Sequence, residues 1–156
     1  MTPAIRVEDP ATPEIVELLE THLSLMRSIT PPESVHALDV EALRRPDVTF
    51  WAVREGAALV GCGAMKVLDA GHGEIKSMHV REAMRGRGIA DLMVETVVDA
   101  ARRRGIARLS LETGSTGHFA AARRLYARHG FTECGPFGDY VPDPHSTFMT
   151  RTLDPA

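Results

Sequence analysis

A short basic segment between positions 85 and 91 has the residue types and spacing best suited to chemistry in this chain. Its sequence is RGRGIAD, with two arginines and two glycines. Arginine guanidinium groups form paired hydrogen bonds to phosphate oxygens, and glycine lets a ligand approach the backbone because it has no Cβ atom. The segment therefore predicts a phosphate or pyrophosphate site, formed by Arg85, Gly86, Arg87, Gly88, Ile89, Ala90 and Asp91.

The residues on either side support a ligand-binding loop. β-compatible residues precede the segment, and apolar residues follow it at helical spacing from Ile89 to Ala101. The segment is thus expected to enter a helix N-terminus, where backbone N–H groups lack intrahelical partners and the helix dipole adds positive charge. The alternative interpretation is a solvated basic turn whose glycines serve only the backbone conformation.

Two common nucleotide-binding motifs do not fit this segment. A dinucleotide fingerprint requires a third glycine at the position of Asp91, where an acid would also repel a pyrophosphate. No Gly-x-x-x-x-Gly-Lys-Ser/Thr run occurs in the sequence, so a P-loop is excluded.

Length and composition indicate one globular domain that spans residues 1–156, with 44% hydrophobic residues. The net charge of −3 gives no general affinity for nucleic acid or for an anionic membrane. No apolar run approaches the ~20 residues of a membrane span, and the first residues lack the pattern of a signal peptide. The expected location is therefore the cytoplasm.

Cysteine and histidine spacing does not indicate a metal site. Cys62 and Cys134 lie in expected strands, where a buried structural thiol is the favoured interpretation. The seven histidines form no H-E-x-x-H arrangement. No metal is predicted.

Turn residues and apolar periodicity divide the chain into strands and helices. A first helix is expected at 11–26, and a second helix, capped by Ser34, is expected to run until Arg45 and Pro46 end it. A later strand–helix–strand unit implies a right-handed crossover and a parallel pair, which gives an α/β fold with a mixed sheet. The expected strands are 4–7, 48–53, 58–67, 74–80, 107–113, 131–134 and 147–153, and the later helices are 89–104 and 118–129.

The motifs and the element order resemble the GNAT superfamily of N-acetyltransferases over nearly the whole chain. Arg85, Gly88 and Ala90 match the family's Arg/Gln-x-x-Gly-x-Gly/Ala motif, and the run LYARHGF at 125–131 is similar to its Leu-Tyr-x-x-x-Gly-Phe signature. The segments 111–114 and 135–140 resemble a bacterial, YsnE-like subgroup. The resemblance implies the GNAT acyl-CoA N-acyltransferase fold, a mixed central sheet flanked by helices, with the basic segment on the pyrophosphate of acetyl-CoA.

The resemblance also implies a reaction and roles for individual residues. An acetyl group would move from acetyl-CoA to a primary amine of a small molecule or peptide, by direct attack in a ternary complex. Tyr126 would act as general acid, and Glu74 as general base with Glu112 as its rival. The alternatives are a core tyrosine and a solvated strand-end carboxylate. Backbone N–H groups from Met78, His79 and Val80 would hold the pantetheine arm and polarise the thioester, which requires a bulge in that strand.

One departure from the family pattern lies at the start of the last helix. Phe119 stands where many members have an asparagine that binds the pantetheine arm. Either His118 or Ser115 supplies the polar contact to the arm, or apolar packing by residues such as Phe119 and Ala122 replaces it. The acceptor pocket is expected between the first helices and a late loop, with His22, Met26, Glu112 and Tyr140 as candidate residues. Packing of His22 and Met26 in the core is the alternative.

A function of a different class stays open at this point. A catalytically silent acyl-CoA-binding sensor or structural module would need the basic segment but neither Tyr126 nor a base. Both of these are present, which favours the enzyme. The expected partner is an amine substrate, and the resemblance leaves a homodimer open.

Overall fold

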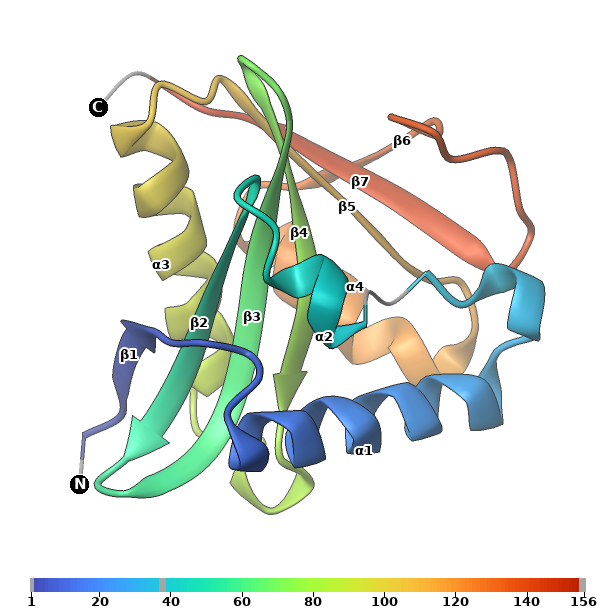
Figure 1. Ribbon diagram of the computed structural model, residues 1–156. Helices are drawn as coiled ribbons and strands as arrows, with labels where there is room; N and C mark the ends of the chain where they lie inside the picture. The colour runs from blue at the N-terminus through green and yellow to red at the C-terminus, as the bar shows by residue number, and fades with distance from the viewer. Residues whose placement is uncertain (1, 37–38, 155–156) are drawn as a thin grey trace.

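A single mixed sheet organises the chain, in the computed structural model that describes residues 2–36 and 39–154 (Figure 1). The seven strands follow the order β1-β2-β3-β4-β5-β7-β6. Neighbouring strands are antiparallel except for β4 and β5, which are parallel, as the expected crossover requires. The strands are β1 (Ala4–Val7), β2 (Val48–Glu55), β3 (Ala58–Asp69), β4 (His72–Val80), β5 (Arg108–Gly114), β6 (Thr132–Cys134) and β7 (Ser146–Thr152).

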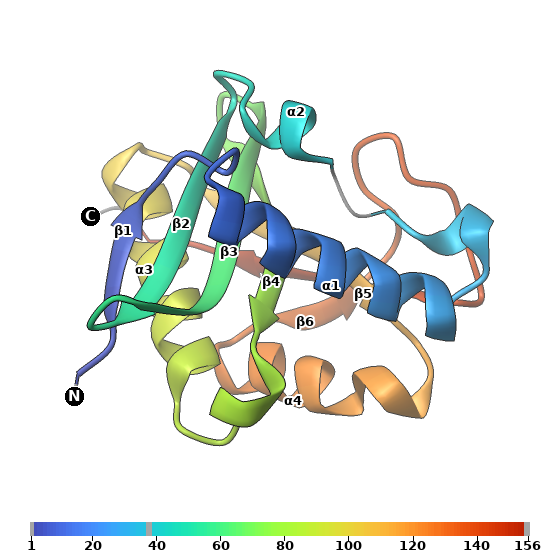
Figure 2. The same cartoon turned by 60° about the horizontal axis from the view of Figure 1, so that its bottom comes forward.

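Helices cover both faces of the sheet. α1 and α2 lie across one face, while α3 and α4 lie on the other (Figures 1 and 2). The helical elements are α1 (Pro13–Ile29), η1 (Pro32–Ser34), α2 (Val40–Leu43), η2 (Glu82–Met84), α3 (Ile89–Arg103), η3 (Gly117–Phe119) and α4 (Ala120–Arg128). The predicted fold class, an α/β mixed sheet flanked by helices, is confirmed.

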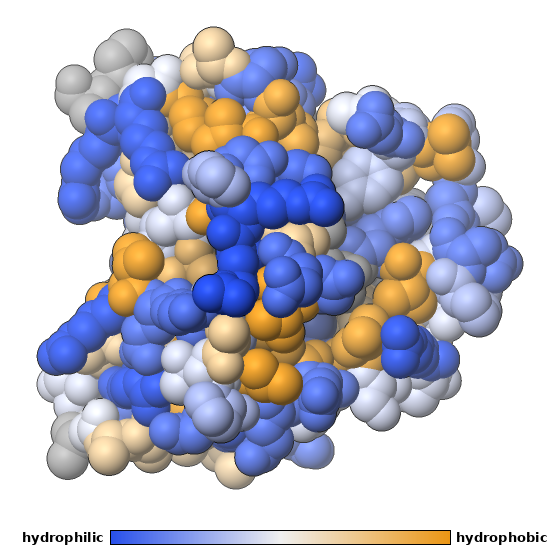
Figure 3. Space-filling model, in the orientation of Figure 1, coloured by the Kyte–Doolittle hydropathy of each residue, from blue (hydrophilic) through white to orange (hydrophobic). Residues whose placement is uncertain are grey.

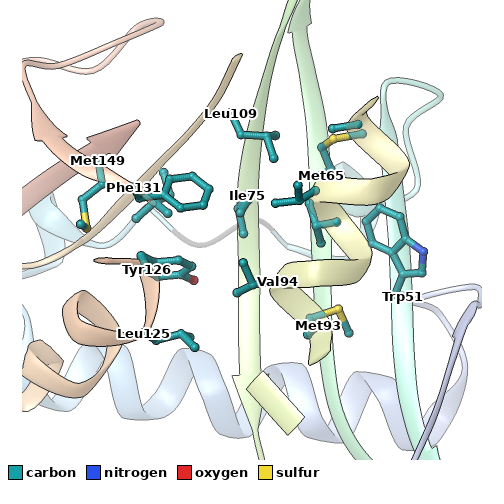
Figure 4. Packing of buried hydrophobic residues seen from close by; sticks show 14 of the residues in the cluster. Trp51, Met65, Ile75, Met93, Val94, Leu109, Leu125, Tyr126, Phe131 and Met149 are labelled. Carbon is teal, nitrogen blue, oxygen red and sulfur yellow. The ribbon is translucent and has the colours of Figure 1, made fainter. Parts of the chain in front are cut away.

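Alternation along the strands creates one apolar core on each face. In β2, Phe50 and Ala52 pack with α1, whereas Trp51 and Val53 belong to the core under α3 and α4. The second core is the larger one, and Figure 4 shows Ile75 of β4 at its centre. On the outside, polar side chains separate small apolar patches on the face seen in Figure 3. Among the described residues, none of the helices combines the length and apolar character required to cross a bilayer.

A β-bulge in β4 positions the region of interest. Between the pairs Cys62↔His79 and Ala64↔Lys76, β3 has one residue and β4 has two. Ser77, one of the two, has a positive φ of 55°, which is unusual for a residue with a Cβ atom. The bulge that the resemblance required is therefore present.

The parallel strands β4 and β5 pair only over four residues. Their register begins at His72↔Arg108 and ends at Ile75↔Leu111. β5 continues its pairing with β7 to Gly114, so beyond Ile75 the two parallel strands separate. The β4 edge from Lys76 onward is thus free of a β5 partner, and a gap opens in the middle of the sheet.

The predicted second helix is wrong in its start. Ser34 belongs to the short η1 turn and donates its hydroxyl to Asp143, while Val35 is extended. The helix begins at Val40 instead, where the Asp39 carboxylate accepts from the Ala42 N–H. An aspartate is at least as good an N-cap as a serine, and the side chain of Ser34 has a tertiary partner. Residues 37 and 38, which the prediction placed in this helix, lie outside the described residues.

Candidate active site

A cavity of about 650 Å³ passes through the gap between β4 and β5. It is bordered by α1 and η1 on one side of the sheet and by α3 and α4 on the other. The structure brings nearly all of the predicted site residues to its wall, from elements far apart in sequence. Those residues are His22, Met26, Glu74, Met78, His79, Val80, Arg85, Gly86, Gly88, Ile89, Ala90, Asp91, Glu112, Phe119, Ala122, Tyr126 and Tyr140.

One end of the cavity has the properties of an anion site. Gly86 and Gly88 have left-handed φ angles of 78° and 81°, and a Cβ atom at either position would meet nothing within 4 Å. Gly88 is the N-cap of α3, and no side chain caps the helix there. The first-turn N–H groups of α3 therefore keep their hydrogen-bonding capacity next to the cavity. Arg85 adds a permanent positive charge to this wall.

The structure does not bring Arg87 to the cavity. Its Nη2 atom lies 3.0 Å from Oε2 of Glu55, at the end of β2, and the residue is absent from the cavity wall. A half-buried carboxylate is a strong partner for a guanidinium group, which accounts for this placement. Two arginines of α4, Arg124 and Arg128, line the cavity instead. Neither was predicted from the sequence, because Arg124 precedes the Leu-Tyr-x-x-x-Gly-Phe signature and Arg128 occupies one of its variable positions.

Asp91 is an acid at the start of α3, and its charge is compensated by α4. His129 Nε2 lies 2.8 Å from Asp91 Oδ1, and the Arg128 guanidinium donates to both carboxylate oxygens. The hydrogen bond with His129 is the main reason that the pKa of Asp91 lies below its ordinary value. The three side chains join α3 to α4 and thereby hold two walls of the cavity together.

Two neutral histidines in the cavity wall contact each other. His22 of α1 and His79 of β4 place their Nδ1 atoms 3.1 Å apart. Burial is the main reason that the pKa of each imidazole is lowered to about 4. Both rings are therefore uncharged at neutral pH, and one Nδ1–H donates to the other Nδ1 atom. The contact joins α1 to the bulged strand.

Tyr126 of α4 is part of the cavity wall. Its ring packs edge-on against Phe131, and Figure 4 shows the hydroxyl directed from α4 towards β4. Burial raises the pKa of Tyr126 far above its ordinary value, so the phenol stays protonated. Phe119 lies nearby against Gly114, where a Cβ atom would come within 2.0 Å of the ring. The aromatic residue at 119 thus depends on a glycine in β5.

A buried polar cluster forms the other end of the cavity. Lys76 Nζ donates to Glu74 Oε2 at 3.1 Å and to Tyr140 Oη at 3.1 Å. The Tyr140 hydroxyl in turn donates to Glu74 Oε2 at 2.6 Å. The Glu74 and Lys76 side chains are only 5% and 9% exposed. Glu74 is therefore a paired carboxylate rather than a solvated strand end.

Glu112 shares this end of the cavity in a different state. It follows Leu111, the β5 residue opposite Ile75, and so stands beside Lys76 where the strands separate. Burial is the main cause that raises the pKa of Glu112 to about 7. Near neutral pH this carboxyl group can therefore take up or release a proton.

The comparisons with known proteins decide the family. The sequence model of the acetyltransferase (GNAT) family matches residues 14–131. The chain belongs to the GNAT family. It is 47% identical over 149 residues to the uncharacterized N-acetyltransferase YsnE of Bacillus subtilis (strain 168), covering 96% of this chain and 99% of YsnE.

Solved GNAT structures share the fold along their whole length. A Klebsiella pneumoniae protein described as an acyl-CoA N-acyltransferase superposes with a TM-score of 0.82 at 28% identity, covering 98% of this chain and 99% of the other. A GNAT acetyltransferase of Elizabethkingia anophelis, with acetyl-CoA bound, has a TM-score of 0.70 at 18% identity, over 97% and 98% of the two chains. The second likeness concerns the fold alone.

Two further residues that line the cavity, Lys76 and His36, were not among those predicted from the sequence. The His36 ring meets Tyr140 edge-on, with centroids 5.0 Å apart, and both residues line the cavity. A contact between positions 36 and 140 depends on tertiary folding, so no local pattern indicates it.

Proposed function

We propose that this GNAT protein transfers an acetyl group from acetyl-CoA to a primary amine of a small molecule or peptide, with both substrates bound together. One observation carries the proposal. A single cavity is lined by the start of α3, whose N-cap Gly88 has no side-chain cap, by the carboxyl groups of Glu74 and Glu112, and by Tyr126. Such a cavity allows a donor and an acceptor to meet without a covalent enzyme intermediate.

The residues present fit acetyl-CoA as the donor. The open, left-handed Gly86 and Gly88, the first turn of α3 and the Arg85 guanidinium would hold the pyrophosphate. The unpaired β4 edge at Met78–Val80 would donate its N–H groups to the pantetheine amides, in the way that an added strand pairs. When bound, acetyl-CoA supplies an activated acetyl carbon and a thiolate leaving group.

We propose Glu112 rather than Glu74 as the general base. An alkyl ammonium group has a pKa near ~10.4 and must lose a proton before its nitrogen can attack. A base with a pKa of about 7, such as Glu112, is suited to accept that proton at neutral pH. Glu74 already accepts from Lys76 and Tyr140, so its role here is to position the Lys76 ammonium.

Tyr126 is proposed as the general acid. As the amine nitrogen bonds to the acetyl carbon and the C–S bond breaks, the departing sulfur needs a proton. The buried phenol is held in its protonated form and lies in the cavity wall, so it can supply one. The acylated nitrogen then loses its second proton, which restores the phenol of Tyr126 through solvent, while Glu112 releases to solvent the proton taken from the ammonium group.

The test is thiol release from acetyl-CoA over a panel of amines, combined with calorimetric titration of acetyl-CoA. Tyr126→Phe is expected to lower kcat roughly 100-fold, as the loss of a general acid does, while the affinity for acetyl-CoA stays within about twofold. Binding of acetyl-CoA without turnover of any amine would instead identify the sensor function. Absence of binding would exclude both functions.

A further inference from the structure

The acceptor end of the cavity is bridged by two contacts between segments distant in sequence. Ser34 Oγ of η1 donates to Asp143 Oδ2 at 2.5 Å, and the His36 ring meets Tyr140 edge-on. Figure 2 shows η1 beside the loop that joins β6 to β7. An extended polypeptide that passed between these segments would have to break both contacts. The bridge therefore favours a small acceptor over an internal peptide segment.

Lys76 has a hydrogen-bond donor left over at this end. An ammonium group has three N–H bonds, and Lys76 uses two of them for Glu74 and Tyr140. Among residues 2–36 and 39–154, no further hydrogen-bond acceptor contacts the Lys76 ammonium group. The side chain is 9% exposed and lines the cavity, so the third N–H is available to an oxygen atom of a bound molecule.

Two hydroxyl groups give independent evidence for a polar ligand. Thr30 Oγ1 and Ser77 Oγ are buried and have no hydrogen-bond partner in the described part of the chain. Both residues line the cavity, one from the end of α1 and one from the β4 bulge. Buried polar groups are nearly always satisfied, so rotation of either side chain towards the cavity would give its hydroxyl a partner in bound water or in a polar ligand.

The positions of Lys76 and Glu112 limit the spacing of the groups on the acceptor. Ile75 and Leu111 are paired, so Lys76 and Glu112 are the next residues on adjacent parallel strands and face the same side. The Lys76 ammonium acts electrostatically on the Glu112 carboxyl group, so the two side chains lie close together. An amine at Glu112 and an oxygen at Lys76 can therefore belong to one small molecule.

We infer that the acceptor is a small α-amino compound, whose amine faces Glu112 and whose adjacent carboxylate or amide oxygen accepts from Lys76. The inference rests on the proposed acetyl transfer and narrows its substrate class. A free amino acid and an amino acid amide share this chemistry. Simple alkylamines and diamines have the amine alone, and a lysine side chain in a protein has no oxygen beside its amine.

The experiment compares three compounds with the same side chain. For each of the protein amino acids, kcat/KM is measured with the free acid, with its amide, and with the amine that decarboxylation leaves. Each kcat/KM is calculated from the concentration of the neutral, unprotonated form of the amine. At least one acid or amide is expected to exceed its decarboxylated partner by 10-fold or more. The comparison of acid with amide identifies which oxygen the site binds. A lysine-containing peptide is the fourth compound and is expected to be a poor substrate.

Variants connect that preference to the lysine. Lys76→Met is expected to reduce the preference for the acid or amide over the decarboxylated amine at least 10-fold. Lys66→Met is the matched control, because Lys66 is a half-buried lysine on the adjacent strand β3 outside the cavity wall, and it should keep the preference. Since Lys76→Met leaves the Glu74 carboxylate buried without a cation, the double variant Glu74→Gln/Lys76→Met removes the pair together and should show the same loss.

The outcomes separate this inference from the proposed function. Turnover with equal or higher kcat/KM for decarboxylated amines, or for the lysine peptide, overturns the inference and leaves acetyl transfer intact. An unchanged preference in the double variant also overturns the role of Lys76. Failure of every amine, with acetyl-CoA bound, overturns the acetyl transfer itself.

Discussion

At the residue scale, burial gives two neighbouring carboxyl groups different properties. Glu74 has an ammonium group and a phenol as partners, whereas burial raises the pKa of Glu112 to about 7. A carboxyl base works in its ionised form. The proposed mechanism therefore predicts that the rate rises with pH as Glu112 loses its proton, well below the pH at which a free amine does so.

The first prediction concerns that rise. In the wild type, kcat/KM should increase as the pH passes about 7, and Glu112→Gln should remove this limb and lower the rate roughly 100-fold at pH 7.5. The measurement is a pH–rate profile of thiol release between pH 5.5 and 9. Glu74→Gln is the control that should keep the limb. A limb that persists in Glu112→Gln but disappears in Glu74→Gln would reverse the two roles.

The sequence predicted which residues lie at the site, but not which of them are ionised or paired by hydrogen bonds. Glu74, Glu112 and Tyr126 were identified from a motif and an alignment of elements, and all three line the cavity. Glu74 and Lys76 contact each other directly, and both also bind Tyr140, which is 64 residues away from Lys76 along the chain. Burial and pairing are products of tertiary contacts, so the choice between the two carboxyl groups stayed open until the fold was known.

At the element scale, the His22–His79 contact attaches α1 to the bulged strand β4. Both imidazoles are neutral in the folded protein, with pKa values lowered to about 4, whereas an unfolded histidine titrates near 6.5. Below pH 6.5 the unfolded chain therefore binds more protons than the folded one. The stability from these two groups is complete above pH 6.5 and is lost as the pH falls towards 4.

The protein should lose stability in acid, and substitution of His22 should reduce that loss. Between pH 7 and pH 5 each histidine should remove about 1–2 kcal/mol from the free energy of unfolding, and His22→Gln should remove about half of the combined decrease. Urea titrations at the two pH values measure it. His118→Gln, at an exposed position, is the control and should behave like the wild type. An equal decrease in wild type and His22→Gln would contradict the assignment.

The start of α3 permits a sharper test of the anion site. Gly88 and Gly105 flank this helix with similar left-handed φ angles of 81° and 73°, and a Cβ atom has open space at both. Glutamate at either position should cost about 1–3 kcal/mol of stability through backbone strain. Only Gly88→Glu places a carboxylate at the proposed pyrophosphate site, so it should weaken acetyl-CoA binding at least 100-fold by calorimetry. Equal affinities of the two variants would move the pyrophosphate elsewhere.

Elements with strong periodicity were predicted closely, and short ones were not. The α3 pattern predicted residues 89–104, and the helix spans Ile89–Arg103. The segment after α1 was predicted as one helix capped by Ser34, but it contains a turn at Pro32–Ser34 and a short helix at Val40–Leu43. Ser34 has the right side chain for a cap, and its long-range partner Asp143 decides its role. Local pattern cannot predict such competition.

At the scale of the whole molecule, the cavity exists because the sheet opens in its middle. β4 pairs with β3 throughout, β5 pairs with β7 throughout, and the two halves share only four residue pairs. Helices α3 and α4 border one side of the opening, and α1 with the loop before β7 borders the other. A ligand that fills this opening would contact both halves of the sheet and would therefore stabilise the folded molecule as a unit.

The last prediction is thus a linkage between donor binding and global stability. A ligand that binds only the folded state adds RT ln(1 + [L]/Kd), which is about 2.7 kcal/mol at 100 times Kd. For a chain of 156 residues this corresponds to a rise in Tm of roughly 5–10 °C. Differential scanning calorimetry with increasing acetyl-CoA measures it. Tyr126→Phe, which leaves the proposed pyrophosphate site at the start of α3 unchanged, should show the full rise in Tm. Gly88→Glu should show almost none. A rise that survives Gly88→Glu would mean that acetyl-CoA stabilises the fold from a different site.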